Sequence, residues 1–321
     1  MEGTYVLPIR RVAADGAAEL AQYLAEIARS MQIVIVDGSD PAVFRAHHLA
    51  WKDVALHVPP APELVTPMGK VGGVLSGLRH AAHDRVVIAD DDVRYDPDTL
   101  RRLLAMLSEY DVVRPQNYFR PLPWHARWDT ARSLLNRVSG GDWPGTLAVR
   151  RSRLEATGGY SGDVMFENLE LVRTVVAAGG REKVAYDVYV RRLPPSSRQF
   201  LSQRVRQAYD ELARPMRLLV WLSVLPLVAL LAISGTWPAV VLLAVAAVAA
   251  AEAGRRRAGG RRYFPWTSSL LAPLWIAERA VCIWPAVGAR LLLGGIPYRD
   301  SRLRRAATPL GELRRRYGSP A

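Results

Sequence analysis

Short apolar runs alternate with longer segments of helical spacing along the first two thirds of the chain. Runs of four to six apolar residues between polar ones are typical of strands buried on both faces. Leu20, Leu24 and Ile27 repeat at spacings of four and three, which predicts a helix over residues 17–29. We expect strands at residues 4–9, 32–36, 54–58, 86–89 and 112–113, and further helices at 69–83, 98–109 and from Glu167. This alternation predicts an α/β fold, with a mostly parallel sheet between flanking helices.

The pattern changes in the last third, where long apolar runs replace the alternation. Residues 196–212 follow two prolines and predict an amphipathic helix. Leu218–Ser234 and Trp237–Ala253 are apolar runs of 17 residues each, at the short end of the roughly 17–25 residues that span a bilayer. Arginines precede and follow this pair, and positive flanks favour the cytoplasmic side. We therefore expect a transmembrane helical hairpin with both ends in the cytoplasm, although soluble buried helices would show a similar pattern.

A third apolar stretch, residues 268–293, is interrupted by two prolines and the pair Glu278-Arg279. A basic tail follows it, and a single span would place that tail outside, against the positive-inside bias. We expect re-entrant or interfacial helices here and a cytoplasmic tail. The predicted domains are an N-terminal α/β region (1–195), an interfacial helix (196–216), a transmembrane hairpin (217–254) and a basic C-terminal region (255–321).

The charge is distributed unevenly along the 321 residues. The net charge is +13, but residues 1–213 carry only +1 and residues 214–321 carry +12. A nucleic-acid-binding protein usually has its basic patch on a water-soluble folded surface. Here the arginines flank apolar segments, which indicates anionic lipid as the partner and no nucleic acid. The single cysteine, Cys282, excludes an intrachain disulfide, and the N-terminus has no signal-peptide pattern. We expect a multi-pass protein of the cell membrane with its N-terminal α/β region in the cytoplasm.

The most informative local feature is the acidic triplet Asp90-Asp91-Asp92, which ends a buried strand. Open α/β sheets bind ligands at the carboxyl ends of their strands. Adjacent carboxylates repel each other unless a cation is bound, and hard oxygen ligands suit Mg²⁺ or Mn²⁺. The alternative is an acidic turn that stabilises the N-terminus of the next helix.

Another strand ends in an acid, Asp37, and parallel strands would place it on the same edge of the sheet. Such an edge suits a nucleotide diphosphate, because one acid binds the base or ribose and another holds the metal that neutralises the phosphates. Lys70 opens a glycine-lined helix where a phosphate contact is possible, although the segment is not a Walker A motif and a solvated lysine is the alternative.

In their order along the chain, these motifs resemble the family 2 glycosyltransferases with the GT-A fold. The motifs are Pro8-Ile9-Arg10, Val36-Asp37-Gly38-Ser39, Gly69-Lys70 to Gly77, Asp90-Asp91-Asp92, Gly158-Gly159-Tyr160 and the helix from Glu167. The resemblance covers most of the chain and is greatest to the membrane-bound branch that includes ceramide glucosyltransferase-like enzymes. It implies sugar transfer from a nucleotide-sugar donor with a divalent metal.

The resemblance also implies roles for single residues. Pro8 and Arg10 would lie on the donor side, Asp37 would bind the base, and Lys70 the diphosphate. Asp90 would bind the ribose or the metal, Asp92 would be the principal metal ligand, and Asp91 would be a turn residue.

The chain departs from the family at the catalytic base. An acidic pair is expected near residue 168, but Asn168 stands in place of the aspartate, and an amide cannot accept a proton at neutral pH. The candidates are Glu167, Glu170 and Asp163. The two glutamates also suit the N-terminus of a helix without any catalytic role.

The acceptor side is less defined. Gln203, Arg206 and Gln207 share one helix face and resemble the family's Gln-x-x-Arg-Trp motif, with Gln207 in place of the tryptophan. Gln203 and Arg206 would close over the donor diphosphate, unless this helix is only interfacial. Trp124 and Trp143 are candidates for stacking on an acceptor, although aromatic residues also pack ordinary loops.

These observations predict a membrane-anchored glycosyltransferase that moves a sugar to a lipid or lipid-linked acceptor. A nucleotidyltransferase of similar fold and a non-catalytic membrane scaffold are the alternatives, the second because of Asn168.

Overall fold

The computed structural model describes residues 1–299 and 301–318. An eight-stranded sheet forms its centre, in the order β3-β2-β1-β4-β7-β6-β8-β5. The strands are β1 (Thr4–Ile9), β2 (Gln32–Asp37), β3 (Leu56–Val58), β4 (Arg85–Ala89), β5 (Val93–Arg94), β6 (Val112–Phe119), β7 (Thr146–Arg150) and β8 (Glu182–Arg192). The first four strands of that order are parallel, as predicted. β7 runs antiparallel to both of its neighbours and β5 is antiparallel to β8, so the sheet is mixed.

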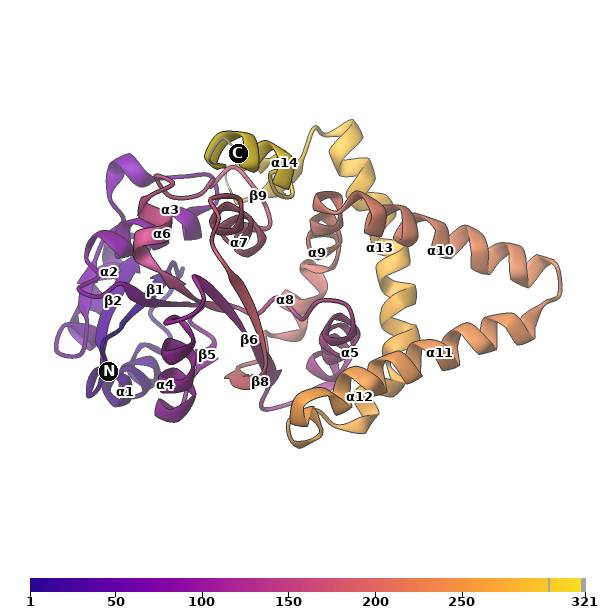
Figure 1. Cartoon of the computed structure of the whole chain (residues 1–321), viewed down its shortest axis with the longest axis horizontal. Helices are drawn as coiled ribbons and strands as arrows, with labels where there is room; N and C mark the ends of the chain where they lie inside the picture. The colour runs from indigo at the N-terminus through magenta and orange to yellow at the C-terminus, as the bar shows by residue number, and fades with distance from the viewer. Residues whose placement is uncertain (300, 319–321) are drawn as a thin grey trace.

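Helices cover both faces of the sheet and give three layers (Figure 1). One apolar core joins the sheet to α1 (Ala17–Ala28), α2 (Pro41–Trp51) and α4 (Pro97–Met106). The other joins it to α3 (Gly69–Arg79), α6 (Arg151–Glu155) and α7 (Glu167–Ala177). Neighbouring residues of β1 enter opposite cores, because successive side chains of a strand point to opposite faces. The predicted α/β layering is thus confirmed.

Glycines let α3 lie unusually close to the sheet. A Cβ on Gly77 would lie 2.5 Å from a methyl group of Val6, and a Cβ on Gly73 would lie 2.9 Å from Pro8. Close approach of a helix to a strand favours glycine despite its low helix propensity. The glycine-rich segment is therefore helical, and it holds Lys70 beside the carboxyl end of β1.

The remaining elements of residues 1–195, which the resemblance implies to be the catalytic region, connect this sheet to the C-terminal helices. α5 (Trp124–Val138) packs against the C-terminal helices, and η1 (Pro62–Leu64) precedes α3. The continuous amphipathic helix predicted for residues 196–212 is wrong. The segment forms α8 (Ser197–Ser202), α9 (Arg204–Tyr209) and η2 (Asp210–Ala213), with a break at Gln203. Phe200 and Tyr209 are both buried within the protein. A straight helix on a surface would not need to bury both of these side chains.

α10 (Pro215–Ile233) and α11 (Trp237–Arg256) form a hairpin that extends away from the catalytic region (Figure 1). Two segments are long and apolar enough to cross a bilayer: Pro215–Ile233, with a mean hydropathy of 2.3, and Trp237–Arg262, with 1.8. None of α10 is buried within the protein. The helices lie where the sequence predicts the hairpin.

The chain returns from the hairpin to the catalytic region. After η3 (Arg257–Arg262) and α12 (Trp266–Leu270), α13 (Ala272–Leu292) continues through Pro285, so the break falls at Leu271 and not at that proline. β9 (Ile296–Tyr298) and β10 (Ser301–Leu303) form a hairpin, and α14 (Leu310–Tyr317) packs against α7. The basic tail therefore lies on the catalytic region.

Candidate active site

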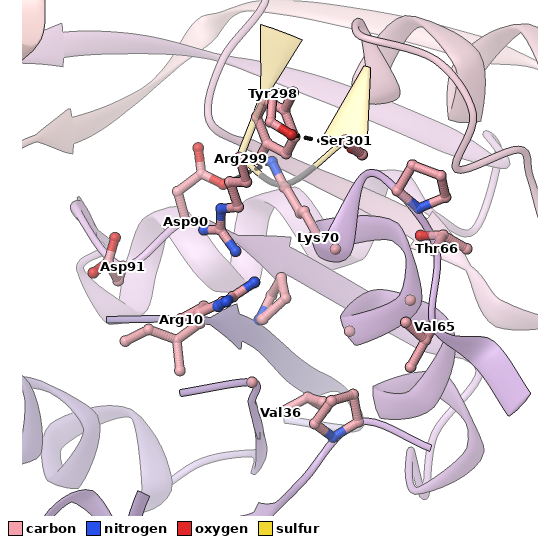
Figure 2. Close-up of a pocket in the computed structure, with 18 of the residues that line it drawn as sticks. Arg10, Val36, Val65, Thr66, Lys70, Asp90, Asp91, Tyr298, Arg299 and Ser301 are labelled. Carbon is pink, nitrogen blue, oxygen red and sulfur yellow. Dashed lines mark hydrogen bonds and ion pairs between the residues drawn. The ribbon is translucent and has the colours of Figure 1, made fainter. Parts of the chain in front are cut away.

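A cavity of about 560 Å³ opens at the carboxyl ends of β1, β2 and β4. Figure 2 shows that residues from distant parts of the sequence meet there. The polar side chains in its lining belong to Arg10, Thr66, Lys70, Asp90, Asp91, Asp92, Arg192, Gln199, Tyr298, Arg299 and Ser301. Pro8 and Gly38 line it as well. The predicted donor-side residues Pro8, Arg10, Lys70, Asp90 and Asp92 are thus brought together.

Asp90 and Asp92 share the cation Arg192, whereas Asp91 contacts a different one. Asp90 Oδ1 lies 2.6 Å from Lys70 Nζ, and Asp90 Oδ2 lies 3.5 Å from Arg192 Nη2. Asp92 Oδ2 accepts a hydrogen bond of 2.9 Å from Arg192 Nε. Asp91 turns away to Arg11, at 2.7 Å, and is the most exposed of the three. The separation of Asp91 from the other two agrees with its expected role as a turn residue.

Asp92 has one oxygen without a hydrogen-bond partner among the described residues. This atom, Oδ1, is buried. Burial raises the pKa of Asp92, Arg192 lowers it and Asp90 raises it again, and the pKa ends above its ordinary value. Two carboxylates, one of them with a free buried oxygen, fit a hard divalent cation that takes its other ligands from phosphates and water. No cluster of three or more metal-binding side chains occurs among residues 1–299 and 301–318.

Lys70 lies between two carboxylates from different elements. Its Nζ is 2.6 Å from Asp90 Oδ1 and 2.8 Å from Glu167 Oε1. Burial lowers the pKa of Lys70, but the two carboxylates outweigh burial and hold the pKa above its ordinary value. Lys70 is therefore a permanent cation that links the donor cavity to the start of α7.

Asp37 is at the same edge of the sheet as the triplet, as predicted, but its side chain lies outside the cavity lining. Its carboxylate is buried and is bonded to His47 at 2.6 Å, His57 at 3.2 Å and the Ser39 amide at 2.9 Å. Burial raises the pKa of Asp37, but these hydrogen bonds lower it to about 2. In this conformation Asp37 fixes the loop at Gly38, and the neighbours Val36 and Gly38 face the cavity.

Gly145 holds Asp90 in place through its backbone. Its carbonyl accepts a 2.8 Å hydrogen bond from the Asp90 amide, and its own amide donates to Asn117 Oδ1 at 2.8 Å. A Cβ on Gly145 would lie 2.5 Å from Asp90 Oδ2 and 3.1 Å from Arg192 Cζ. No side chain fits here without moving the acidic site.

We expect Gly145→Ala to lower the turnover number by about 10- to 100-fold, because a shift of about 1 Å in a catalytic group can cost up to about 100-fold. The measurement is the steady-state rate of sugar transfer. Gly311→Ala is the matched control, since its Cβ meets only Arg315 at 3.8 Å. Equal rates for the two variants would show that Asp90 tolerates displacement.

The three candidate bases lie in different places. Glu167 is paired with Lys70 beside the donor cavity, whereas Asp163 and Glu170 line a second cavity of about 200 Å³. Glu170 is buried and accepts a 2.6 Å hydrogen bond from the Thr308 amide, so it anchors the C-terminal segment. The Asn168 amide donates to the Pro144 carbonyl at 3.1 Å. Only Glu167 of the three is in contact with the donor site.

The acceptor-side candidates also separate. Trp143 and Gln207 line a third cavity of about 140 Å³, between the catalytic region and the C-terminal helices. Trp124 is about half exposed and packs on Trp128 and Phe200, outside these cavities. Gln203 and Arg206 were expected over the donor diphosphate, but neither lines the donor cavity. Arg206 lies over the ring of Tyr298. Gln203 lies at the break between α8 and α9, where its carbonyl accepts from the Gln207 amide.

Arg192 and the β9–β10 hairpin are parts of the site that sequence reasoning missed. Arg192 ends β8, and Tyr298, Arg299 and Ser301 come from a segment more than 200 residues after the triplet. Arg299 has a φ of 51°, a left-handed conformation that is uncommon outside glycine. In the sequence the basic tail indicated only contact with a membrane. It contains no local motif that predicts a place in a cavity.

Comparison with known proteins places this geometry in a family. A model of the glycosyltransferase-like family 2 matches residues 17–210, more than half of the chain. No curated protein matches. The chain is similar to the structure of the mannosyltransferase PcManGT from Pyrobaculum calidifontis in complex with GDP-mannose and Mn²⁺, with 21% identity and a TM-score of 0.50 over 88% of this chain and 87% of that one.

A weaker similarity is to TarS of S. aureus. Residues 1–349 of TarS are 16% identical over 65% of this chain and 64% of that one, with a TM-score of 0.44. For the same fragment in complex with UDP-GlcNAc the values are 15%, 63%, 61% and 0.43. The family match and the mannosyltransferase fold agree with the GT-A-like sheet described above. The chain belongs to the family 2 glycosyltransferases and is a nucleotide-sugar-dependent glycosyltransferase.

Proposed function

We propose that this enzyme is anchored in a membrane and transfers a sugar to a lipid or lipid-linked acceptor. The observation that carries the proposal is the position of the exposed apolar hairpin α10–α11, which begins directly after the third cavity. An anchor of this kind raises the effective concentration of an acceptor held in the same membrane. The catalytic region and the basic tail would both face the cytoplasm.

Different parts of the donor cavity have different charge, and each part suits a different group of a nucleotide sugar. Arg10, Lys70 and Arg299 extend into the same space (Figure 2), and they suit the two phosphates. Asp90 and Asp92 would hold a divalent cation, which neutralises the charge of the leaving diphosphate when it is bound. The apolar edge formed by Pro8, Val36 and Pro60 suits the base.

The reaction then needs one displacement. An acceptor oxygen forms a bond to the anomeric carbon while the bond from that carbon to the diphosphate oxygen breaks. The electron pair leaves with the nucleoside diphosphate. A hydroxyl acceptor would give its proton to a carboxylate, and Glu167 is the candidate in contact with the donor site. A phosphate acceptor is already ionised and needs no base.

We expect Arg299→Ala to raise the KM for the nucleotide sugar by about 10- to 100-fold with little change in the turnover number. Removing a hydrogen-bonding cation from a phosphate costs about 1.5–3 kcal/mol of binding free energy. Initial rates at varied donor concentration measure the effect. Arg304→Ala is the matched control, because Arg304 is exposed on the same segment. An unchanged donor KM would show that the β9–β10 hairpin does not bind the donor.

Membrane anchoring has its own test. The full chain should stay in the membrane pellet after washing at high pH and high salt, because α10 and α11 would be held by hydrophobic burial and not by charge. Release of the chain into the wash would show that the hairpin packs on protein instead.

A further inference from the structure

The third cavity lies where the catalytic region meets the C-terminal helices. Its lining includes Trp275 and the charged residues Arg132, Arg192, Asp210, Glu211, Arg214, Arg217 and Arg279. Arg192 also lines the donor cavity, where it binds Asp92. The two cavities therefore meet at one side chain, and a ligand in the third cavity would lie beside the sugar donor.

Five arginines and two acids line this cavity, and the pairing within it is incomplete. Glu211 is shared by Arg214 and Arg217, at 3.4 Å and 3.1 Å. Arg132 is satisfied by Asp129 and Asp142. Arg192 is likewise paired with acids outside the lining. The other three arginines, Arg214, Arg217 and Arg279, have only Glu211 and Asp210 in the lining to neutralise them.

Two donor groups on α13 are buried and have no hydrogen-bond partner among the described residues. They are Arg279 Nε and Trp275 Nε1, on side chains that are each 2% exposed. Arg214 Nε is a third such atom, at the start of α10. A buried donor without a partner costs about 1–3 kcal/mol, so such groups around one cavity indicate a missing acceptor of hydrogen bonds. Clustered arginine donors suit a phosphate.

Asp210 is consistent with an anion in this cavity. Its Oδ1 is buried without a partner. Burial has the largest effect on the pKa of Asp210 and raises it, Arg279 and Arg214 lower it, and Glu167 and Glu211 raise it, so that the pKa ends at about 8. A carboxyl group with this pKa is largely protonated at pH 7 and can donate to a phosphate oxygen.

The surroundings of the cavity indicate that the phosphate carries an apolar chain. Arg214 and Arg217 lie at the base of α10, and Trp275 and Arg279 on α13, which packs against α10 (Figure 1). Beyond the cavity the two helices expose Leu219, Val220 and Leu274, each at least 45% accessible. A head group in the cavity would leave its hydrocarbon along these side chains.

We propose that this cavity binds the phosphate of the acceptor, and that the acceptor is a lipid phosphate monoester whose own oxygen attacks the sugar. The inference rests on the proposed function and names its substrate class. The new bond joins the phosphate oxygen to the anomeric carbon, the bond from that carbon to the diphosphate breaks, and the electron pair leaves with the nucleoside diphosphate. A phosphate monoester has a second pKa of about 6, so it is ionised at pH 7 and transfers no proton. This accounts for Asn168 in the position of the family's base.

The test uses the full chain in membranes, a panel of labelled nucleotide sugars, and a total lipid extract that is used untreated or after phosphatase treatment. We expect a labelled lipid that is anionic and acid-labile, and at least a tenfold loss of product with the treated extract. A neutral labelled lipid, or equal product from both extracts, would overturn the inference and leave the proposed function intact. No labelled lipid from any donor would overturn both. Inorganic phosphate is tested in parallel, and a water-soluble sugar phosphate would show that the site takes free phosphate and not a lipid.

A variant pair links the effect to this cavity. Trp275→Phe keeps an aromatic side chain, although a smaller one, and removes the unpartnered N–H. We expect it to raise the acceptor KM by about tenfold while the donor KM stays the same. Arg279→Gln should raise the acceptor KM further. Trp284→Phe, about half exposed on the same helix, is the matched control. Equal acceptor KM values for Trp275→Phe and Trp284→Phe would contradict the assignment.

Discussion

Asp92→Ala is expected to lower sugar transfer by about 10²–10³-fold. Of the three acids, Asp92 has the buried oxygen without a partner, and it also holds Arg192 at the junction of two cavities. Loss of this carboxylate removes the group that would hold a divalent cation against the leaving diphosphate, and losing one electrostatic stabiliser of a transition state typically costs about 10²–10³-fold. The measurement is the rate of nucleoside diphosphate release with Mn²⁺ or Mg²⁺ and a saturating donor.

Asp91→Ala is the matched control for that result. The two side chains are neighbours in sequence, but Asp91 pairs with Arg11 away from Lys70 and Arg192. We expect Asp91→Ala to keep its rate within about fivefold of the unchanged enzyme. Equal losses in both variants would show that the triplet acts as a diffuse negative patch and not through Asp92.

Lys70→Met is expected to have the largest effect on stability, lowering the free energy of unfolding by about 3 kcal/mol. The side chain of Lys70 is only 18% exposed and lies between Asp90 and Glu167. Without this cation Glu167 has no cationic partner among the described residues, and Asp90 keeps only Arg192, at 3.5 Å. Breaking a buried pair costs about 3–5 kcal/mol, with less where solvent reaches the site. Denaturant unfolding in detergent measures the change.

Two further variants identify the cause of that loss. Lys52→Met removes an exposed lysine after α2, and it should change stability by less than about 0.5 kcal/mol. The double variant Lys70→Met with Glu167→Gln should recover part of the loss, because it also removes the carboxylate that Lys70→Met leaves without a cation. A double variant that is no more stable than Lys70→Met would contradict the electrostatic explanation.

The parallel half of the sheet was predictable because its signals are local. β1, β2 and β4 are short apolar runs, and the glycines of α3 record its close contact with Val6 and Pro8. The antiparallel strand β7 was not predicted, because Thr146–Arg150 has no flanking signal that gives its direction. The break at Gln203 was missed for a related reason. The pattern shows an apolar face but not that Phe200 and Tyr209 are buried in different places.

The candidate site shows the same contrast between features with a local sequence signal and features that depend on tertiary packing. Asp90, Asp92 and Lys70 were identifiable because each closes or opens a regular element at one edge of the sheet. Asp37 marked that edge correctly, yet its carboxylate is taken by His47 and His57, whose approach depends on the packing of α2 and β3.

Arg192 and Arg299 required the tertiary structure. Arg192 ends a long strand with no motif, and Arg299 reaches the donor cavity only because the chain returns from the apolar hairpin. Contacts between segments this far apart in sequence leave no periodic pattern to recognise.

Donor binding with and without a divalent cation tests the central claim most directly. The full chain in detergent would be titrated with a panel of nucleotide sugars in Mn²⁺, in Mg²⁺ and in chelator, and binding followed by calorimetry. The account predicts that at least one donor binds in the presence of metal, that chelator weakens this binding at least tenfold, and that Asp92→Ala removes the metal dependence. Binding of the same strength in metal, in chelator and in Asp92→Ala would contradict it.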